Sequence, residues 1–170
     1  MDKSNTLNIL KKAFLMEQRG KTLYETARDH AENEEVKTFF QELVEDEKKH
    51  MEILERQFKS VNESGQFTVQ DYDTMGIDPD NPDHSDILDN TIINKINAAG
   101  FEATAITAAV NFEQKAVTIY AQRAKETNDP EEKKIYNWLS LWEETHLKKL
   151  MALQESLMAK IWDDNSFWPL

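Results

Sequence analysis

The segment LSLWEETHLKKLMALQ, from Leu139 to Gln154, has the composition of a charged helix, but its apolar face carries two groups capable of chemistry. Steps of three and four residues along that face lead from Leu139 to Leu150 through Glu143 and His146. A buried carboxylate or imidazole is costly unless it is paired or bound to a metal. Glu143 and His146 are therefore candidate metal ligands.

The same groups recur 96 residues earlier, because the two halves of the chain resemble each other. At this offset each half has one Glu-x-x-His motif, and a single Glu precedes each motif by 30 residues. Matching leucines are unremarkable, whereas a match of every core-facing Glu and His indicates a shared chemical role. The inward-facing acids and imidazoles are Glu17, Glu47 and His50 in the first half, and Glu113, Glu143 and His146 in the second.

A Glu-x-x-His motif places its two side chains about 60° apart around a helix and about one turn along it, so both can reach one point between helices. Four carboxylates and two imidazoles thus converge on the axis of the predicted bundle. Without metal, the buried carboxylates would repel one another and mostly take up protons. Two divalent ions cancel four negative charges, and oxygen with imidazole ligation suits iron or manganese. We therefore predict a dinuclear site for two such ions: iron, manganese or a mixture of both.

Two neighbouring acids are alternative ligands. Glu144 is two positions from His146, and this spacing turns the two side chains to different faces of a helix. Asp46 is four positions before His50 and could share its face. Trp142 occupies the position equivalent to Asp46 in the second half, so the repeat argues against Asp46.

Four long helices must position these groups. Apolar residues at helical spacing predict helices at about 5–30, 35–61, 101–127 and 130–160. Asp129-Pro130-Glu131 is a strong start signal for the last helix, because it combines a capping side chain, a proline in the first turn and an acid at the positive end of the helix dipole.

The segment between the second and third helices, residues 62–100, is rich in turn-forming residues. Its length suits a crossover along a bundle, with a short amphipathic helix at about 87–97. We therefore expect an all-α fold: a four-helix bundle in a single domain over residues 1–170, built from helix pairs at about 5–61 and 101–160.

Composition limits the classes of function. The net charge of −12, from 20 basic and 32 acidic residues, disfavours nucleic acid and anionic membranes as partners. Without cysteine the chain has no zinc–thiolate site, iron–sulfur centre or thiol nucleophile. No segment approaches the roughly 20 apolar residues of a membrane span, and the first residues lack a signal-peptide core. We expect a cytoplasmic protein.

The site pattern resembles the ferritin-like di-iron carboxylate superfamily, in which two helices carry one Glu and two carry Glu-x-x-His. The chain is most similar to its rubrerythrin-like branch over about residues 5–160, and ENEEVKTFFQELVEDEKKHMEIL resembles the second helix of that branch. The resemblance implies two bridging carboxylates, and a terminal Glu and His on each iron. Glu47 and Glu143 would bridge, Glu17 and His50 would complete one iron, and Glu113 and His146 the other.

Two features depart from the family pattern. A further carboxylate one turn beyond the third-helix Glu is replaced here by Ala116, whose repeat mate is Gly20. We therefore expect the symmetric six-ligand site, in which iron has no seventh carboxylate to move toward. Gly20 and Ala116 either let helices approach or leave space where O₂ or peroxide binds. The four-cysteine rubredoxin domain of the family is also lacking, so the expected reductant is external, such as a rubredoxin-like protein.

Tyr24 and Tyr120 each follow an inward-facing Glu by seven residues, which places them two turns further along the same face. Each phenol either hydrogen-bonds a ligand carboxylate, and so orients it, or packs in the core with its hydroxyl group satisfied elsewhere.

The leading hypothesis is a non-haem di-iron oxidoreductase that reduces H₂O₂ or O₂ with electrons from an external donor, as a homodimer. Ferritin-type iron oxidation and storage is a second hypothesis, and a structural bundle with a vestigial site is a third. The sequence identifies neither the true oxidant nor the electron donor.

Overall fold

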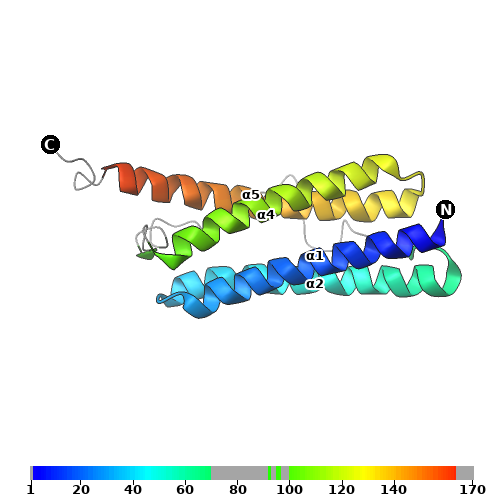
Figure 1. The fold of residues 1–170 in the computed structure, drawn as a ribbon, viewed down its shortest axis with the longest axis horizontal. Helices are drawn as coiled ribbons and strands as arrows, with labels where there is room; N and C mark the ends of the chain where they lie inside the picture. Colours follow the sequence, from blue (N-terminus) through cyan, green and yellow to red (C-terminus); the bar gives the residue numbers. More distant parts are fainter. Residues whose placement is uncertain (1, 70–91, 93–94, 97–99, 164–170) are drawn as a thin grey trace.

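The structure, a computed structural model, describes residues 2–69, 92, 95–96 and 100–163, and four long helices dominate it (Figure 1). They are α1 (Lys3–His30), α2 (Glu34–Ser64), α4 (Phe101–Glu126) and α5 (Pro130–Asp163). All four predicted helices are thus confirmed to within three residues at each end. Most of the expected crossover, and of the short helix at about 87–97, lies outside the described residues.

Polar caps set the helix boundaries. Asn33 caps the start of α2. Asp129 accepts hydrogen bonds of 3.0 Å from the backbone N–H groups of Glu131 and Glu132, which confirms the predicted start of α5. At the other end of α2, Gly65 has a φ of 75°, a left-handed conformation that glycine adopts without strain.

The helices pack as two antiparallel pairs, as Figure 1 shows. α1 lies along α2 and α4 lies along α5, and the two pairs meet where α1 packs against α4. α1 and α4 run in opposite directions, as expected for two similar halves related by a pseudo-twofold axis. The predicted four-helix bundle of two helix-pair repeats is confirmed.

The apolar core is divided into two clusters, and equivalent residues of the two halves lie in opposite clusters. Leu43 belongs to one cluster and its repeat mate Leu139 to the other. Leu54 and Leu150 are divided in the same way. On α2, Leu43 and Leu54 belong to opposite clusters, and the sequence between them contains Glu47 and His50. A buried polar layer therefore lies between the two apolar clusters.

No helix in the described part of the chain is both long and apolar enough to cross a membrane.

Candidate metal centre

The polar layer contains all six groups that the repeat singled out. Each of them is buried, with at most 1% of its surface exposed. α1 and α4 contribute one carboxylate each, and α2 and α5 contribute a carboxylate and an imidazole each. The six residues are Glu17 on α1, Glu47 and His50 on α2, Glu113 on α4, and Glu143 and His146 on α5.

The structure gathers these groups into two overlapping clusters. One contains Glu17, Glu47, His50 and Glu143; the other contains Glu47, Glu113, Glu143 and His146. In each cluster one ligand atom from every residue lies within 4.8 Å of the others. Glu47 and Glu143 belong to both clusters, an arrangement consistent with a dinuclear metal site whose two positions share two carboxylates. That these side chains bind metal stays a prediction.

Both imidazoles turn Nδ1 toward the shared carboxylates. His50 Nδ1 lies 3.0 Å from Oε1 of Glu143 and 3.2 Å from Oε2 of Glu17. His146 Nδ1 lies 3.1 Å from the other oxygen of Glu143. The two ring centroids are 5.8 Å apart. Glu143 therefore lies between the imidazoles, with one oxygen facing each.

Several carboxylate oxygens in the layer lack a hydrogen bond within the described part of the chain. They include both oxygens of Glu47 and Oε2 of Glu113, all fully buried. A buried acceptor without a partner costs about 1–3 kcal/mol, and more when it is charged. Since these oxygens belong to the two clusters, a pair of cations would satisfy them, and the donor set fits the predicted metals.

The carboxylates have strongly perturbed pKa values. Burial, followed by the charge of Glu143, raises the pKa of Glu113 to about 8. The same two causes raise the pKa of Glu47 well above its usual range, and the pKa of Glu17 also rises. Burial alone would raise the pKa of Glu143 too, but the adjacent imidazoles hold it well below the usual range. In the metal-free layer, protons therefore take the place that metal cations would occupy. Metal binding would release these protons.

The pKa values of both imidazoles are raised, whereas burial alone lowers the pKa of a histidine. Burial lowers the pKa of His50, but the charge of Glu143 and hydrogen bonds to the carboxylates outweigh it, so this pKa lies well above its usual range. His146 also has a raised pKa, because hydrogen bonds to Asp46 and to the carboxylates outweigh burial. The layer thus attracts positive charge of any kind.

The two predicted tyrosines contact the layer crosswise. The Tyr24 hydroxyl group donates a hydrogen bond to Oε1 of Glu113, and the Tyr120 hydroxyl group donates one to Oε1 of Glu17. Both tyrosines are buried. Each therefore holds the carboxylate of the opposite half, a partner that the spacing along one helix does not reveal.

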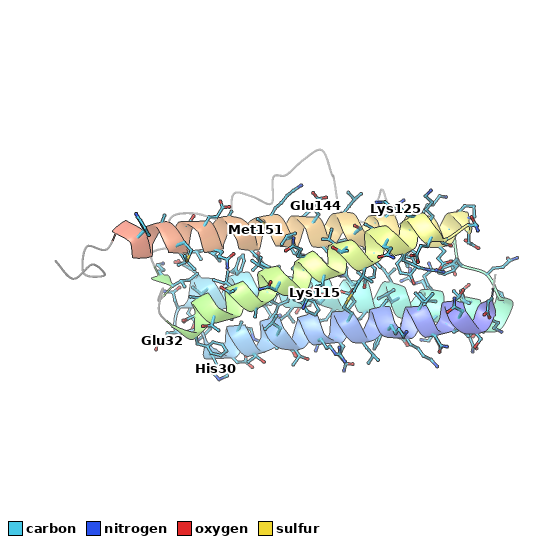
Figure 2. All side chains as sticks on the ribbon, turned by 45° about the horizontal axis from the view of Figure 1, so that its top comes forward. His30, Glu32, Lys115, Lys125, Glu144 and Met151 are labelled. Atoms are coloured by element: carbon cyan, nitrogen blue, oxygen red, sulfur yellow. The ribbon has the colours of Figure 1, made fainter. Side chains whose placement is uncertain are left out.

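Asp46 contacts a histidine, but a different one from that considered in the sequence. Its Oδ2 lies 3.2 Å from Nε2 of His146 on α5 and accepts a hydrogen bond of 3.4 Å from Nε1 of Trp142. Its Oδ1 is paired with Lys49 at 2.8 Å. In the sequence, the only sign of a special role for Asp46 was that its equivalent position in the second half is occupied by Trp142. Glu144 points away from the bundle and pairs with Lys148 at 3.0 Å (Figure 2).

Gly20 does not leave space for an oxidant. A Cβ atom at this position would lie 2.7 Å from the ring of Phe112 on α4 and 3.3 Å from the carboxyl carbon of Glu47. The small residue lets the two helices approach, and the ring of Phe112 fills the space beside it. Ala116, its repeat mate, is buried in an apolar cluster.

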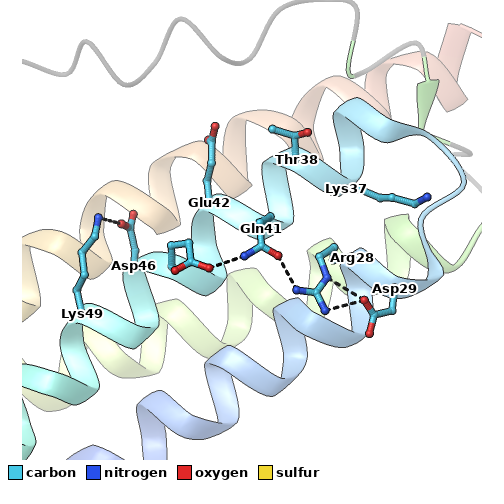
Figure 3. Close-up of a pocket in the computed structure, with 9 residues that line it drawn as sticks. Arg28, Asp29, Lys37, Thr38, Gln41, Glu42, Asp46 and Lys49 are labelled. Atoms are coloured by element: carbon cyan, nitrogen blue, oxygen red, sulfur yellow. Dashed lines mark hydrogen bonds and ion pairs between the residues drawn. The ribbon is translucent and has the colours of Figure 1, made fainter.

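A surface groove of about 720 Å³ lies along α2 on the outer side of the layer (Figure 3). Asp46 and Lys49 line it together. Further along it, Arg28 pairs with Asp29 at 2.7 Å and donates a hydrogen bond of 2.5 Å to Gln41. The charges of these residues are therefore neutralised within the groove, and Asp46 connects it to the buried histidine.

Comparisons with known proteins agree with this arrangement. The sequence model of the rubrerythrin family matches residues 8–154. No curated protein matches the chain. Among solved structures, "CopM in the Cu(II)-bound form" has a similar fold, with a TM-score of 0.58 and 15% sequence identity over 88% of this chain and 95% of that one. Because the family model matches most of the sequence, this four-helix bundle with its buried carboxylate and histidine layer belongs to the rubrerythrin family.

Proposed function

We propose that the protein is a di-iron oxidoreductase of the rubrerythrin type, which reduces hydrogen peroxide or O₂ with electrons from an external donor. The observation that carries the proposal is the pair of overlapping buried clusters that share Glu47 and Glu143. If stability were the only requirement, four carboxylates at the centre of a bundle would be unfavourable. Such an arrangement is expected where metal binding is the function.

Six side chains would hold the two ions. Glu17 and His50 would complete one position, called here the Glu17–His50 position, and Glu113 and His146 would complete the other, the Glu113–His146 position. Two bound iron(II) ions would supply the two electrons that convert H₂O₂ and two protons into two molecules of water.

The protein itself would contribute orientation and exclusion of water. Tyr24 and Tyr120 would fix one oxygen each of Glu113 and Glu17 and leave the second oxygen of each to bind a metal. The apolar clusters on both sides of the layer keep it dry, which strengthens every charge interaction inside it. We further predict that the electrons come from an external donor and that the protein is a homodimer.

Iron is the proposed metal, with copper as the competitor to test. The solved structure of similar fold was determined with Cu(II), but at 15% identity that likeness concerns the fold. Carboxylate-rich sites with a single imidazole per metal suit iron or manganese, although most sites bind copper(II) more tightly than the other divalent metals. Copper(II) therefore has to be included as a separate arm of any metal titration.

Anaerobic titration with Fe(II), followed by stopped-flow mixing with either H₂O₂ or O₂, tests the proposal. We expect binding to stop near two irons per chain and the loaded protein to react faster with peroxide than with O₂. Uptake of many irons per chain would identify a storage protein, and a strong preference for O₂ would identify ferritin-type oxidation. Absence of tight binding by iron, manganese and copper would refute a metal centre altogether.

A further inference from the structure

The two imidazoles of the layer differ at the nitrogen that faces away from the carboxylates. His146 Nε2 lies 3.2 Å from Oδ2 of Asp46. His50 Nε2 is buried and has no hydrogen-bond partner within the described ranges. Both rings are fully buried, so solvent does not compensate for the difference. The two metal positions therefore have unequal support.

One pair of repeat mates accounts for this inequality. Asp46 and Trp142 are equivalent positions in the two halves, at the offset of 96 residues that relates all six candidate ligands. Asp46 reaches across from α2 to His146 on α5. Trp142 instead lies edge-on against His50, with ring centroids 5.0 Å apart and planes at 84°. The two halves thus place different side chains against the imidazoles: a carboxylate against His146 and an indole ring against His50.

The protonation of each ring decides what this difference does. An imidazole that binds a metal through Nδ1 carries its hydrogen on Nε2. At His146 that N–H donates to Asp46, which fixes the tautomer and the ring orientation and makes Nδ1 more basic. At His50 the same tautomer buries an N–H group without an acceptor in the described part of the chain, which is unfavourable.

We propose that Asp46 is a positioning residue for the Glu113–His146 position and makes it the tighter of the two metal positions, an inference that rests on the proposed metal centre. Lys49 and Trp142 hold the Asp46 carboxylate in place, at 2.8 Å and 3.4 Å. The first metal ion therefore binds beside His146, and the second binds beside His50. Partners of this kind typically change metal affinity by about 10–100-fold, and we expect the two positions to differ by that factor.

Calorimetric titration of the metal-free full-length chain with Co(II) tests this inference without any measurement of activity. The wild-type protein should bind two ions with dissociation constants about 10–100-fold apart. Asp46→Ala should weaken the tighter class by that factor, leave the weaker class within about threefold, and make the classes nearly equal. Asp46→Asn keeps the shape and one acceptor oxygen, so it should fall between the two.

Single-position variants identify which class is which. Glu17→Ala removes a ligand of the Glu17–His50 position only, and its remaining binding should be tight and sensitive to Asp46→Ala. Glu113→Ala should leave weaker binding that is insensitive to Asp46→Ala. Glu45→Ala is the matched control: Glu45 is the adjacent residue on α2, is half exposed and pairs with Lys48 at 2.8 Å. It should leave both dissociation constants unchanged.

The outcomes separate this inference from the proposed function. If two equal Co(II) sites appear, or if Asp46→Ala weakens both classes equally, the metal centre stands and the role of Asp46 is refuted. If wild-type protein binds none of Co(II), Fe(II), Mn(II) and Cu(II), the metal centre and the inference both fail. Urea unfolding of each metal-free variant shows whether a change in affinity comes from lost structure; Asp46→Asn provides the second measurement if Asp46→Ala does not fold.

Discussion

Tyr24 on α1 donates a hydrogen bond from its hydroxyl group to Glu113 on α4, 89 residues away in the chain. Tyr120 on α4 donates the reciprocal bond to Glu17 on α1. Each half of the bundle thus holds the carboxylate of the other half, at the seam where the two helix pairs meet. The orientation of the candidate ligands is therefore coupled to the packing of the halves.

Replacement of Tyr24 by phenylalanine should destabilise the metal-free protein. Tyr24→Phe leaves a buried carboxylate oxygen without its donor, and we expect the free energy of unfolding to fall by about 1–3 kcal/mol. Urea denaturation monitored by circular dichroism measures the change. Tyr136→Phe is the matched control, because the Tyr136 hydroxyl group is buried without a hydrogen bond in the described part of the chain. It removes no hydrogen bond of that part of the chain and should therefore reduce stability by less than Tyr24→Phe does. Equal losses in both variants would mean that the bond to Glu113 contributes nothing.

Removal of a carboxylate that both clusters share should abolish binding of more metal ions than removal of a carboxylate in one cluster. Glu47 lies in both clusters, so Glu47→Ala should abolish tight binding at both positions. Glu17 lies in one cluster, so Glu17→Ala should leave one ion per chain. Metal analysis after gel filtration of Fe(II)-loaded protein, kept anaerobic, gives the stoichiometry. Retention of one ion by Glu47→Ala would show that this carboxylate does not bridge.

The stability of the metal-free protein should decrease as pH rises. The pKa of Glu113 in the folded protein, about 8, exceeds the ordinary value of 4.5, so the folded state holds this proton more tightly than the unfolded chain. The stabilisation is complete below pH 4.5 and is lost as pH rises through 8. The raised pKa values of His50 and His146 act in the same direction above their ordinary value of 6.5.

Thermal unfolding in the presence of a chelator, between pH 6 and 9, measures this dependence. Each proton held only by the folded state contributes about 1.4 kcal/mol per pH unit. Glu113→Gln removes one of these protons and should flatten the slope. The lowered pKa of Glu143 affects stability only below its ordinary value of 4.5, outside this range. A melting temperature that rises from pH 6 to 9 in the metal-free protein would contradict the prediction.

Metal loading should stabilise the fold by mass action. Each position that is saturated at 100 times its dissociation constant adds about 2.7 kcal/mol. Differential scanning calorimetry of Fe(II)- or Mn(II)-loaded protein should therefore show a higher melting temperature, and a chelator should reverse the increase. Mg²⁺ serves as the control, because it retains its water molecules and favours all-oxygen ligation. An equal effect of Mg²⁺ would point to surface acids, not the buried layer.

The sequence by itself determined the four helices, the repeat and the six groups that face inward. These features depend on the periodicity of 3.6 residues per turn and on residue type, and both can be read along one helix at a time. Burial of Glu47 and His50 between apolar positions of α2, for example, follows from the apolar spacing of that helix alone.

Only the tertiary structure decided which groups meet across helices. Asp46 and His146, 100 positions apart, come together because α2 and α5 are rotated and offset so that one side chain reaches the other. The crosswise bonds of the tyrosines and the ring of Phe112 over Gly20 have the same origin. A helix pattern states which face is buried, but the relative rotation and axial offset of two helices follow from how all their side chains interlock. The difference between Asp46 and its repeat mate Trp142 is present in the sequence, but only the interlocking places Asp46 against His146 and Trp142 against His50.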